Sequence, residues 1–458
     1  MLLDVLTTQC DELGPDARFC LARFVLRFEL RESKGHSTKE IAQSFGVSER
    51  VMSASLKALV AVGALISRSE LTGKKGRAGR FYRVSKEWVK GGYDKSPSVL
   101  DAAECHLEVI AELLQHPRVV MERPPVEYPP AAECGDMQLE RARARGRAAR
   151  KARQVGRLSN LNRLIMAVLL CRADRLGVVR TLGHAELSKL TGLASERLSN
   201  RIKTLLAGGL IRAYVPGATS TVLFRPTKSF YFLNLGHPDL AGPQQVVTSI
   251  VWPQPWEGEE IEGEAAARFR KKAPSSDRFL SFFHDKHQQA VSRVFQVRID
   301  EYASCFLSTC WSSLCDKPHR RKAVLMDRIR EDFKPPRSTS EASADVFPNE
   351  GEIQQLLNSL YSAALRKARR VQAAMPSVVG LDFELMDHQI LPSPAVLYRG
   401  APVFPFVSVL SASRTVSCEI WSYVVDLNMP SPVLFPTEQE IPLEDRYCYG
   451  LLTPPGGV

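Results

Sequence analysis

The sequence predicts a mainly helical protein with small β-hairpins, in which one helical unit occurs twice ahead of an α+β C-terminal region. The first observation behind this prediction is an internal repeat: Glu40–Gly63 and Glu186–Gly209 align without a gap, 146 positions apart. The positions that match include the apolar pairs Ile41 with Leu187, Met52 with Leu198 and Leu59 with Leu205. The second observation is that a pair of strand-like segments follows each copy. We call the two copies the first repeat and the second repeat.

Each repeat is expected to form two helices joined by a tight turn. In the first repeat, Ser37 and Glu40 have the spacing of a capping box, in which a hydroxyl and a carboxylate satisfy each other's backbone N–H groups. Gly46 then supplies the positive φ that a sharp turn requires. Ser48 can cap the next helix, whose apolar residues recur at helical spacing. The opposite face of that helix carries small, polar or basic residues: Glu49, Arg50, Ser53, Ala54 and Lys57.

The segments that follow the repeats predict β-hairpins. After the first repeat, residues 64–68 and 81–84 would form two strands, joined by a glycine-rich tip at 71–80 with four basic residues and no acid. After the second repeat, residues 210–215 and 221–225 would form the corresponding strands, joined at a Pro-Gly turn. The second hairpin is therefore expected to be nearly neutral at its tip.

Helix, turn, helix and hairpin in this order resemble the winged-helix family, including its MarR-like and plasmid-initiator branches. The segments Gly63–Ile66 and Gly209–Ile211, which end the second helix of each repeat, are typical of that family. The resemblance covers about residues 16–90 and 158–235, under half of the chain. It implies two winged-helix domains with small β-wings, followed by an α+β C-terminal region.

The length of 458 residues suggests about two to four domains. The expected divisions are a first winged-helix domain, a helical and arginine-rich linker, a second winged-helix domain and a C-terminal α+β region, at 1–92, 93–157, 158–250 and 251–458. Supporting first helices are expected at 16–33 and 158–176. Further helices are expected at 99–116, 277–333 and 351–374, with aromatic strand material at 226–250 and short strands in the last 80 residues.

Charge favours a polyanionic partner. The chain has a net charge of +11 and a pI near 9.2. Residues 139–157 hold eight basic residues after Glu140 and no further acid. Such a segment can be a solvated helix or a tether, but this density of unpaired charge favours contact with phosphates.

Other features of the sequence argue against a membrane or secreted protein. No run of 18 or more apolar residues occurs, so no membrane partner is expected. The first residues lack the basic region of a secretory leader, and the ten cysteines fall at uneven spacings. We therefore expect a cytoplasmic, nucleoid-associated protein with free thiols.

Motifs of catalysis and metal binding are missing from the sequence. It contains no GxxxxGK[ST], GxSxG, HExxH or CxxC, so we expect neither an enzyme nor a cofactor. The ligand-like clusters are residues 284–287 and a group formed by Cys305, Cys310, Cys315 and His319. Helical residues five apart point about 140° apart, and this spacing is also unusual for zinc. No metal site is expected.

The resemblance implies that the outward faces of the second helices enter the DNA major groove. Arg50 or Arg201 could pair with guanine and Asn200 with adenine. Because Arg50 aligns with Glu196, and Ala54 with Asn200, the two half-sites should differ in sequence. The predicted DNA contacts are Ser48, Arg50, Ser53, Lys57, Lys74, Lys75, Arg77, Arg80, Arg143, Arg147, Arg150, Lys151, Ser195, Ser199, Asn200, Arg201 and Lys203.

Together these features favour a sequence-specific double-stranded DNA-binding protein that regulates transcription. A replication initiator of a plasmid or mobile element is an alternative, because Rep-type initiators also carry two winged helices in tandem. A scaffold whose winged helices bind protein partners is a second alternative. The C-terminal region leaves homodimerisation and effector binding open.

Overall fold

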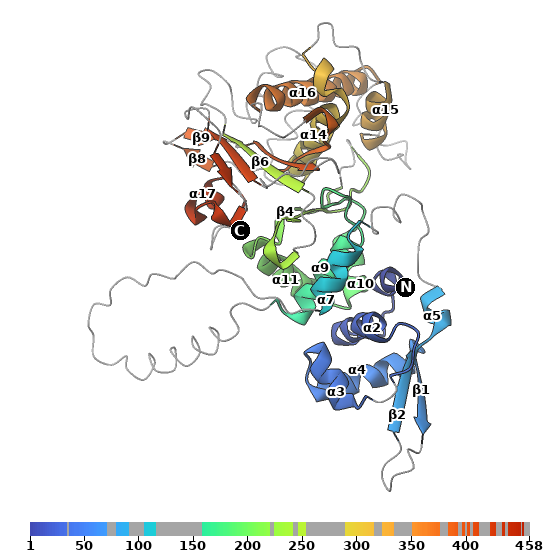
Figure 1. Cartoon of the computed structure of the whole chain (residues 1–458). Helices are drawn as coiled ribbons and strands as arrows, with labels where there is room; N and C mark the ends of the chain where they lie inside the picture. Colours follow the sequence, from blue (N-terminus) through green and yellow to red (C-terminus); the bar gives the residue numbers. More distant parts are fainter. Residues whose placement is uncertain are drawn as a thin grey trace, which may run out of the picture. The chain divides into compact units, whose positions relative to one another are not determined.

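The structure is a computed structural model of the whole chain (Figure 1). The residues that it describes are 1–33, 36–70, 79–90, 105–115, 158–219, 224–240, 246–252, 289–315, 323–333, 350–375, 383–392, 396–398, 401–403, 406–411, 422–426, 433–435, 438–449 and 451–452. Helices dominate, and the sheets are small and mainly antiparallel, as the sequence predicts.

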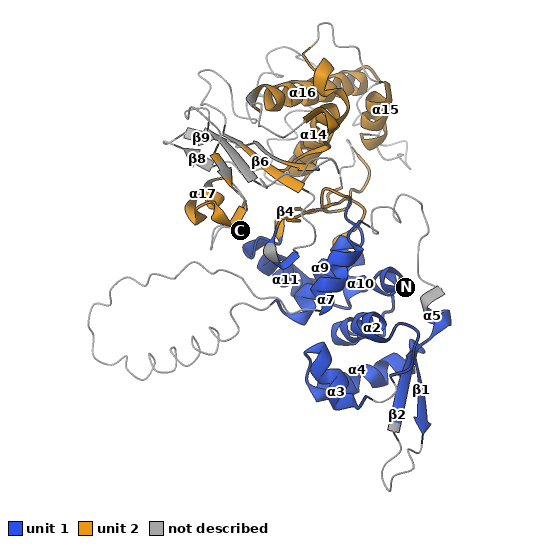
Figure 2. Cartoon of the chain, in the orientation of Figure 1, with its two compact units in different colours: residues 1–174, 185–210, 237–242 blue, residues 175–184, 211–236, 243–458 orange. Residues whose placement is uncertain are grey.

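The chain divides into two compact units (Figure 2). Unit 1 contains Met1–Asp174, Ala185–Leu210 and His237–Gly242, and unit 2 contains Arg175–His184, Ile211–Gly236 and Pro243–Val458. This division differs from the predicted domains, because both repeats lie in unit 1 whereas the strands after the second repeat lie in unit 2.

Unit 1 contains most of the described N-terminal helices and one hairpin. The elements before the second repeat are α1 (Leu2–Thr7), α2 (Pro15–Phe28), α3 (Thr38–Phe45), α4 (Glu49–Ala61), β1 (Leu65–Glu70), β2 (Gly79–Val84), α5 (Lys86–Lys90), α7 (Leu107–Gln115) and α9 (Asn160–Leu170). The second repeat forms α10 (His184–Thr191) and α11 (Ser195–Ala207), and the 3-10 helix η1 (Pro238–Leu240) follows. Strands β1 and β2 pair antiparallel, from Leu65 opposite Val84 to Glu70 opposite Gly79.

The internal repeat is confirmed in the backbone. Helices α3 and α10 begin and end at equivalent positions 146 residues apart, and so do α4 and α11. The turn glycines Gly46 and Gly192 both have φ of 68°, and Gly63 and Gly209, which end the second helices, both have φ of 73°. The same sequence pattern therefore gives the same local structure twice.

The first repeat has better helix caps than the second. The predicted capping box is present, with Ser37 accepting from the backbone N–H of Glu40 and the Glu40 carboxylate accepting from that of Ser37. These hydrogen bonds lower the pKa of Glu40. Ser48 Oγ accepts from the backbone N–H of Val51 at 3.3 Å. The equivalent residue of the second repeat is Ala194, which has no side chain that can cap α11.

This difference between the caps predicts opposite effects of two exchanges. Ser48→Ala should destabilise α4 by about 0.5–2 kcal/mol, because one backbone N–H loses its acceptor. Ala194→Ser should stabilise α11 by a comparable amount, because Ala194 already has extended backbone angles (φ −61°, ψ 148°) close to those of Ser48 (φ −71°, ψ 152°). Amide hydrogen exchange along the two helices would measure both. Faster exchange in α11 after Ala194→Ser would contradict this.

Helix α2 is the supporting helix of the first repeat, and it is shorter than predicted. It begins at Pro15, whose ring is tolerated in the first helical turn, and ends at Phe28 rather than near residue 33. Glu29 follows with a positive φ of 52°, which breaks the helix. Phe19 and Phe24 are buried on α2, which packs against α4 and α9.

Helix α7 is an integral part of unit 1, although the sequence placed it in a linker. Its residues Ile110, Leu113 and Leu114 are buried, and the helix packs against α2 and α9. Arg163 of α9 donates from Nε to the carbonyl of Leu113 at 2.6 Å and from Nη2 to that of Leu114, which satisfies the C-terminal end of α7. The predicted linker is therefore partly core, and its arginine-rich segment lies outside the described residues.

Unit 2 contains three described sheets. One has the order β3-β5-β4, from β3 (Val178–Val179), β5 (Phe230–Leu233) and β4 (Ile211–Val215). A five-stranded sheet has the order β12-β11-β6-β10-β7, from β12 (Val433–Phe435), β11 (Ser422–Asp426), β6 (Val246–Trp252), β10 (Phe406–Ser411) and β7 (His388–Ile390). In this sheet β11 and β6 are parallel, and the other pairs are antiparallel. Strands β8 (Val396–Tyr398) and β9 (Ala401–Val403) form a hairpin.

The helices of unit 2 pack with the five-stranded sheet around a large apolar core. They are α14 (Gln289–Cys310), η4 (Trp311–Ser313), α15 (Ala323–Asp332), α16 (Glu350–Ala374), η6 (Phe383–Leu385), η7 (Glu438–Glu440) and α17 (Leu443–Cys448). Helix α14 packs against α16 and β7, and its Tyr302 and Phe306 are buried in the core. The described part of the predicted helix over 277–333 is divided, because α14 ends at Cys310, after which η4 begins, and α15 begins at Ala323.

The strands of unit 2 can be compared with two expectations from the sequence. Strand β4 pairs with Phe230–Leu233, whose aromatic side chains are buried. Of the segment 221–225 that was expected to pair with it, residues 221–223 lie outside the described residues. The predicted boundary at 250/251 also divides β6, which pairs with β10 and β11 from the C-terminal region.

A buried ion pair joins segments of unit 2 that are far apart in the sequence. The guanidinium of Arg212 donates from Nη2 to the Glu438 carboxylate, and the exposed fractions of the two side chains are 3% and 5%. The same nitrogen lies 2.9 Å from Asn234 Oδ1 and 2.9 Å from Thr248 Oγ1. Strands β4 and β6 and helix η7 thus share one polar network inside the unit.

The described residues can also be examined for membrane-spanning helices and for free cysteines. None of the helices in the described part of the chain combines the length and apolarity that a membrane span requires. The cysteines found as free thiols are Cys10, Cys20, Cys105, Cys171, Cys305, Cys310 and Cys315.

Candidate nucleic-acid interface

Helix α4 presents one polar and basic face to solvent. Met52, Leu56 and Leu59 are buried, so the rotation of the helix about its axis is fixed by the core. Among the predicted contacts, Arg50, Ser53 and Lys57 are exposed on α4, and Ser48 is exposed at its N-cap. The hydroxyl of Ser48 already accepts a backbone hydrogen bond. The side chains on α4 that are available to an outside partner therefore include Arg50, Ser53 and Lys57.

Helix α11 presents the equivalent face with different chemistry. Ser195, Asn200 and Lys203 are exposed, whereas Ser199 and Arg201 are half-buried. Ser199 Oγ donates to the Ser195 carbonyl at 3.0 Å, so this hydroxyl is hydrogen-bonded to the backbone of its own helix.

Arg201 also has an intramolecular contact. Its Nη1 lies 3.5 Å from Ser159 Oγ, at the N-terminus of α9. Asn200 and Lys203 are exposed, whereas Arg201 is half-buried and its side chain lies near α9. The predicted outward orientation is therefore better supported for Asn200 and Lys203 than for Arg201.

The hairpin adds exposed basic residues beside the first repeat. Arg80, which was expected in the glycine-rich tip, is exposed near the start of β2. The predicted contacts Lys74, Lys75 and Arg77 of the hairpin tip, and Arg143, Arg147, Arg150 and Lys151 of the arginine-rich segment, lie outside the described residues.

Sequence reasoning overlooked two exposed arginines near these surfaces. Arg197 lies in the first turn of α11, three residues before Asn200, and Arg83 lies on β2, three residues after Arg80. Helical residues three apart are surface neighbours, and this spacing could have indicated Arg197. Alternation along the strand does not indicate Arg83, because Phe81, Tyr82 and Val84 around it are all buried.

Two buried arginines of α2 hold the two repeats at equivalent positions. Arg23 Nη2 donates to the Ser44 carbonyl of α3 at 2.6 Å, and Arg18 Nη1 donates to the Leu190 carbonyl of α10 at 3.0 Å. Ser44 and Leu190 are equivalent residues of the repeat, each in the last turn of its helix. One helix thus supplies donors to both of these helix ends, where carbonyls lack partners within the helix.

Burial shapes the chemistry of these arginines. It lowers the pKa of Arg23 to about 10 and also lowers that of Arg18. The guanidinium of Arg23 also lies 5.2 Å from the centre of the Phe45 ring. These contacts fix α3 and α10 relative to α2 within unit 1.

The two repeats contact each other's supporting helices in a reciprocal way. Asn160 Nδ2, at the start of α9, donates to the carbonyl of the turn glycine Gly46 at 3.4 Å. Gly192, the turn glycine of the second repeat, packs against Leu13 and Gly14 at the start of α2. Gly14 and Asn160 lie 146 positions apart, which is the spacing of the repeats, and each lies at the start of a supporting helix. The first contact is therefore repeated with the roles of the repeats exchanged. Helices α2 and α9, which are also equivalent, pack against each other. This is the contact pattern of a two-fold dimer within one chain.

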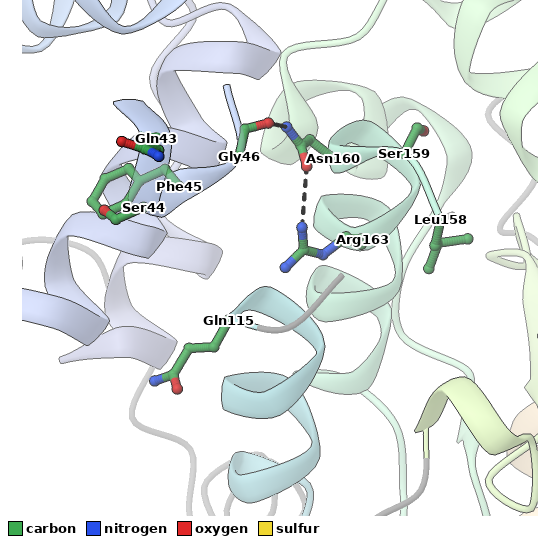
Figure 3. A pocket seen from close by; sticks show the side chains of 9 residues that line it. All are labelled: Gln43, Ser44, Phe45, Gly46, Gln115, Leu158, Ser159, Asn160 and Arg163. Atoms are coloured by element: carbon green, nitrogen blue, oxygen red, sulfur yellow. Dashed lines mark hydrogen bonds between the residues drawn. The ribbon is translucent and has the colours of Figure 1, made fainter. Parts of the chain in front are cut away.

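The two reciprocal contacts are not packed equally well. At Gly192, an added Cβ would lie 2.6 Å from the Leu13 carbonyl oxygen and 3.1 Å from Arg18 Nε, whereas a Cβ at Gly46 would have no neighbour within 4 Å. A pocket of about 430 Å³ lies at the Gly46 contact (Figure 3). Its lining includes Ser44, Asn160 and Arg163, and Figure 3 shows Asn160 between Gly46 and Arg163. The contact at Gly192 is thus tightly packed against Leu13 and Arg18, and we call it closed. The contact at Gly46 borders the pocket, and we call it open.

The described residues offer no metal site. Nowhere in the described part of the chain do three or more His, Cys, Asp or Glu residues lie together as ligands for a metal ion. Cys305, Cys310 and Cys315 are separate free thiols, and residues 284–287 and His319 lie outside the described ranges.

Comparison with known proteins identifies no family for this chain. No protein-family model matches the sequence, and no curated protein matches it. The chemistry of the exposed helix faces therefore carries the functional argument.

Proposed function

We propose that the chain is a sequence-specific double-stranded DNA-binding protein and a regulator of transcription. In this proposal, α3–α4 with the β1–β2 hairpin belong to one winged-helix domain, and α10–α11 belong to a second one. Helices α4 and α11 enter the major groove, whose width of about 12 Å admits a helix. The two half-sites that they bind differ in sequence.

The observation that carries the proposal is the pair of equivalent solvent-facing helix surfaces. Both helices are held by buried apolar residues on one side and carry exposed polar and basic side chains on the other. Arg50 and Lys57 on α4, and Asn200 and Lys203 on α11, are exposed residue types that pair with base edges or phosphates. A buried or acidic surface at either helix would have argued against this function.

The basic residues around the helices would supply affinity that does not depend on sequence. Arg80 and Arg83 of β2 are exposed, and the hairpin tip and residues 139–157 add further Lys and Arg in the sequence. Contacts of this kind with phosphates release counterions, so affinity should fall steeply with added salt.

Selection of bound duplexes from a random DNA pool at near-physiological salt tests the proposal. An enriched motif with two different elements supports it, and the position of this motif in a genome separates promoters from origins. Directly repeated origin sequences with local strand opening would instead indicate a replication initiator. Absence of DNA binding, together with salt-insensitive binding of a protein partner, would show that these domains are a scaffold.

Variants of the two helices should affect different halves of the selected site. Arg50→Ala should cost about 1–3 kcal/mol of binding and relax the preference in one element only, and Asn200→Ala should do the same in the other element. Arg330→Ala is the control: it removes one charge from an exposed pair with Asp327 in unit 2. Selection with each variant would measure the preferences. Loss of both elements in one variant would contradict the assignment of one helix to each half-site.

A further inference from the structure

Unit 1 has the contacts of a two-fold dimer, and this constrains the DNA that it can bind. Gly46 contacts Asn160 at the start of α9, and the equivalent Gly192 contacts Gly14 at the start of α2. Such reciprocal contacts arise when a rotation of about 180° relates the two copies, whereas a head-to-tail arrangement would use two different surfaces. Helices α4 and α11 belong to the two copies, so the same rotation relates them.

We infer that the DNA site consists of two unlike elements in inverted orientation, on opposite strands and at one fixed separation. The inference rests on the proposed function. B-DNA has two-fold axes perpendicular to its own axis, so helices related by a two-fold axis of the protein meet half-sites in inverted orientation. In a direct repeat, one of the two half-sites would have the wrong strand orientation for the helix that binds it.

The separation is fixed because one helix holds both repeats. Arg23 donates to the Ser44 carbonyl and Arg18 to the equivalent Leu190 carbonyl, and both arginines are buried in α2. Arg18 also donates from Nε to the Leu13 carbonyl at 3.0 Å, beside the closed contact at Gly192. Arg18 and Arg23 are therefore positioning residues, which set the distance and angle between α4 and α11 without touching DNA themselves.

The test compares the unaltered full-length protein on four duplexes built from the two selected elements. These duplexes carry the elements inverted at the selected separation, inverted with about five extra base pairs, directly repeated, or one element alone. Five base pairs turn one half-site by about half of the 10–10.5 bp helical repeat, to the other side of the duplex. The expected result is that the inverted site at the selected separation binds roughly 10-fold to 100-fold more tightly than the other three.

Each outcome of this comparison has a separate meaning. Equal binding of inverted and direct repeats, or equal binding at both separations, overturns the inference and leaves DNA binding in place. Failure to bind any duplex, including the one from which the element was selected, overturns the proposed function itself.

A variant separates the role of Arg18 in positioning from a role in stability alone. Arg18→Met should keep the affinity for a single element and should reduce the penalty of the five inserted base pairs at least roughly threefold, because α10 is no longer held to α2. Arg27→Met is the control, since Arg27 is exposed on the same helix. An unchanged penalty, or an equal loss of affinity for single elements and full sites, would exclude Arg18 as a positioning residue.

Discussion

Gly192→Ala is expected to destabilise unit 1 by about 2–5 kcal/mol. Two physical effects add at this position. The residue has φ of +68°, where a side chain costs about 1–2 kcal/mol. The new Cβ would also lie 2.6 Å from the Leu13 carbonyl oxygen, a backbone atom that cannot move away freely, and overpacking of this kind costs about 1–3 kcal/mol more. Amide hydrogen exchange of peptides from α2 and α10 would measure the loss.

Gly46→Ala is the matched control for this substitution. Gly46 has the same φ of +68° at the equivalent position, but a Cβ there would meet nothing within 4 Å. The control should therefore cost only the backbone strain, about 1–2 kcal/mol. The difference between the two variants isolates the contact between the second repeat and the start of α2. Equal destabilisation by the two substitutions would show that this contact is not closed as described.

Arg212→Met is expected to destabilise unit 2 by about 3–5 kcal/mol. The substitution leaves the Glu438 carboxylate buried, with 5% of its side chain exposed, and without its charged partner. Asn234 and Thr248 also lose the donor that lies 2.9 Å from each. Denaturant unfolding followed by tryptophan fluorescence would measure the effect, because four of the five Trp residues, at 252, 256, 311 and 421, belong to unit 2.

Two further variants test the physical reason for this effect. Arg330→Met removes an exposed pair with Asp327 in the same unit and should change stability by no more than about 1 kcal/mol. The double variant Arg212→Met, Glu438→Gln removes the buried charge together with its partner and should recover part of the lost stability. A double variant that is less stable than Arg212→Met alone would show that the buried charge is not the cause.

The local structure of the repeats could be predicted from sequence because short-range chemistry determines it. The capping box at Ser37, the cap at Ser48 and the positive φ of Gly46 each depend on residues within one turn of the chain. The gapless alignment of the second repeat then extended the same helix bounds to α10 and α11. The exposed faces of these helices followed from the burial of their apolar residues.

The packing of these elements could not be predicted in the same way, because it depends on contacts between distant residues. Arg18 and Leu190 are 172 positions apart, and nothing in the local pattern of α2 distinguishes Arg18 from an exposed arginine. The five-stranded sheet joins Val246–Trp252 to strands more than 150 residues later, so the predicted boundary at 250/251 was placed inside a strand. Helix α7 was assigned to a linker although its apolar face, with Leu113 and Leu114, required a partner.

The repeat within one chain has a consequence that a pair of identical subunits would not have. A symmetric dimer looks the same in both directions along a duplex, and such a complex has no front or back. Here Arg50 of one copy is replaced by Glu196 in the other, and only the second copy continues into unit 2. A bound molecule would therefore point one way along the double helix, and its larger unit would be tethered to the same element at every copy of the site. Reversing the orientation of the site in the duplex would reverse the direction in which the bound protein points.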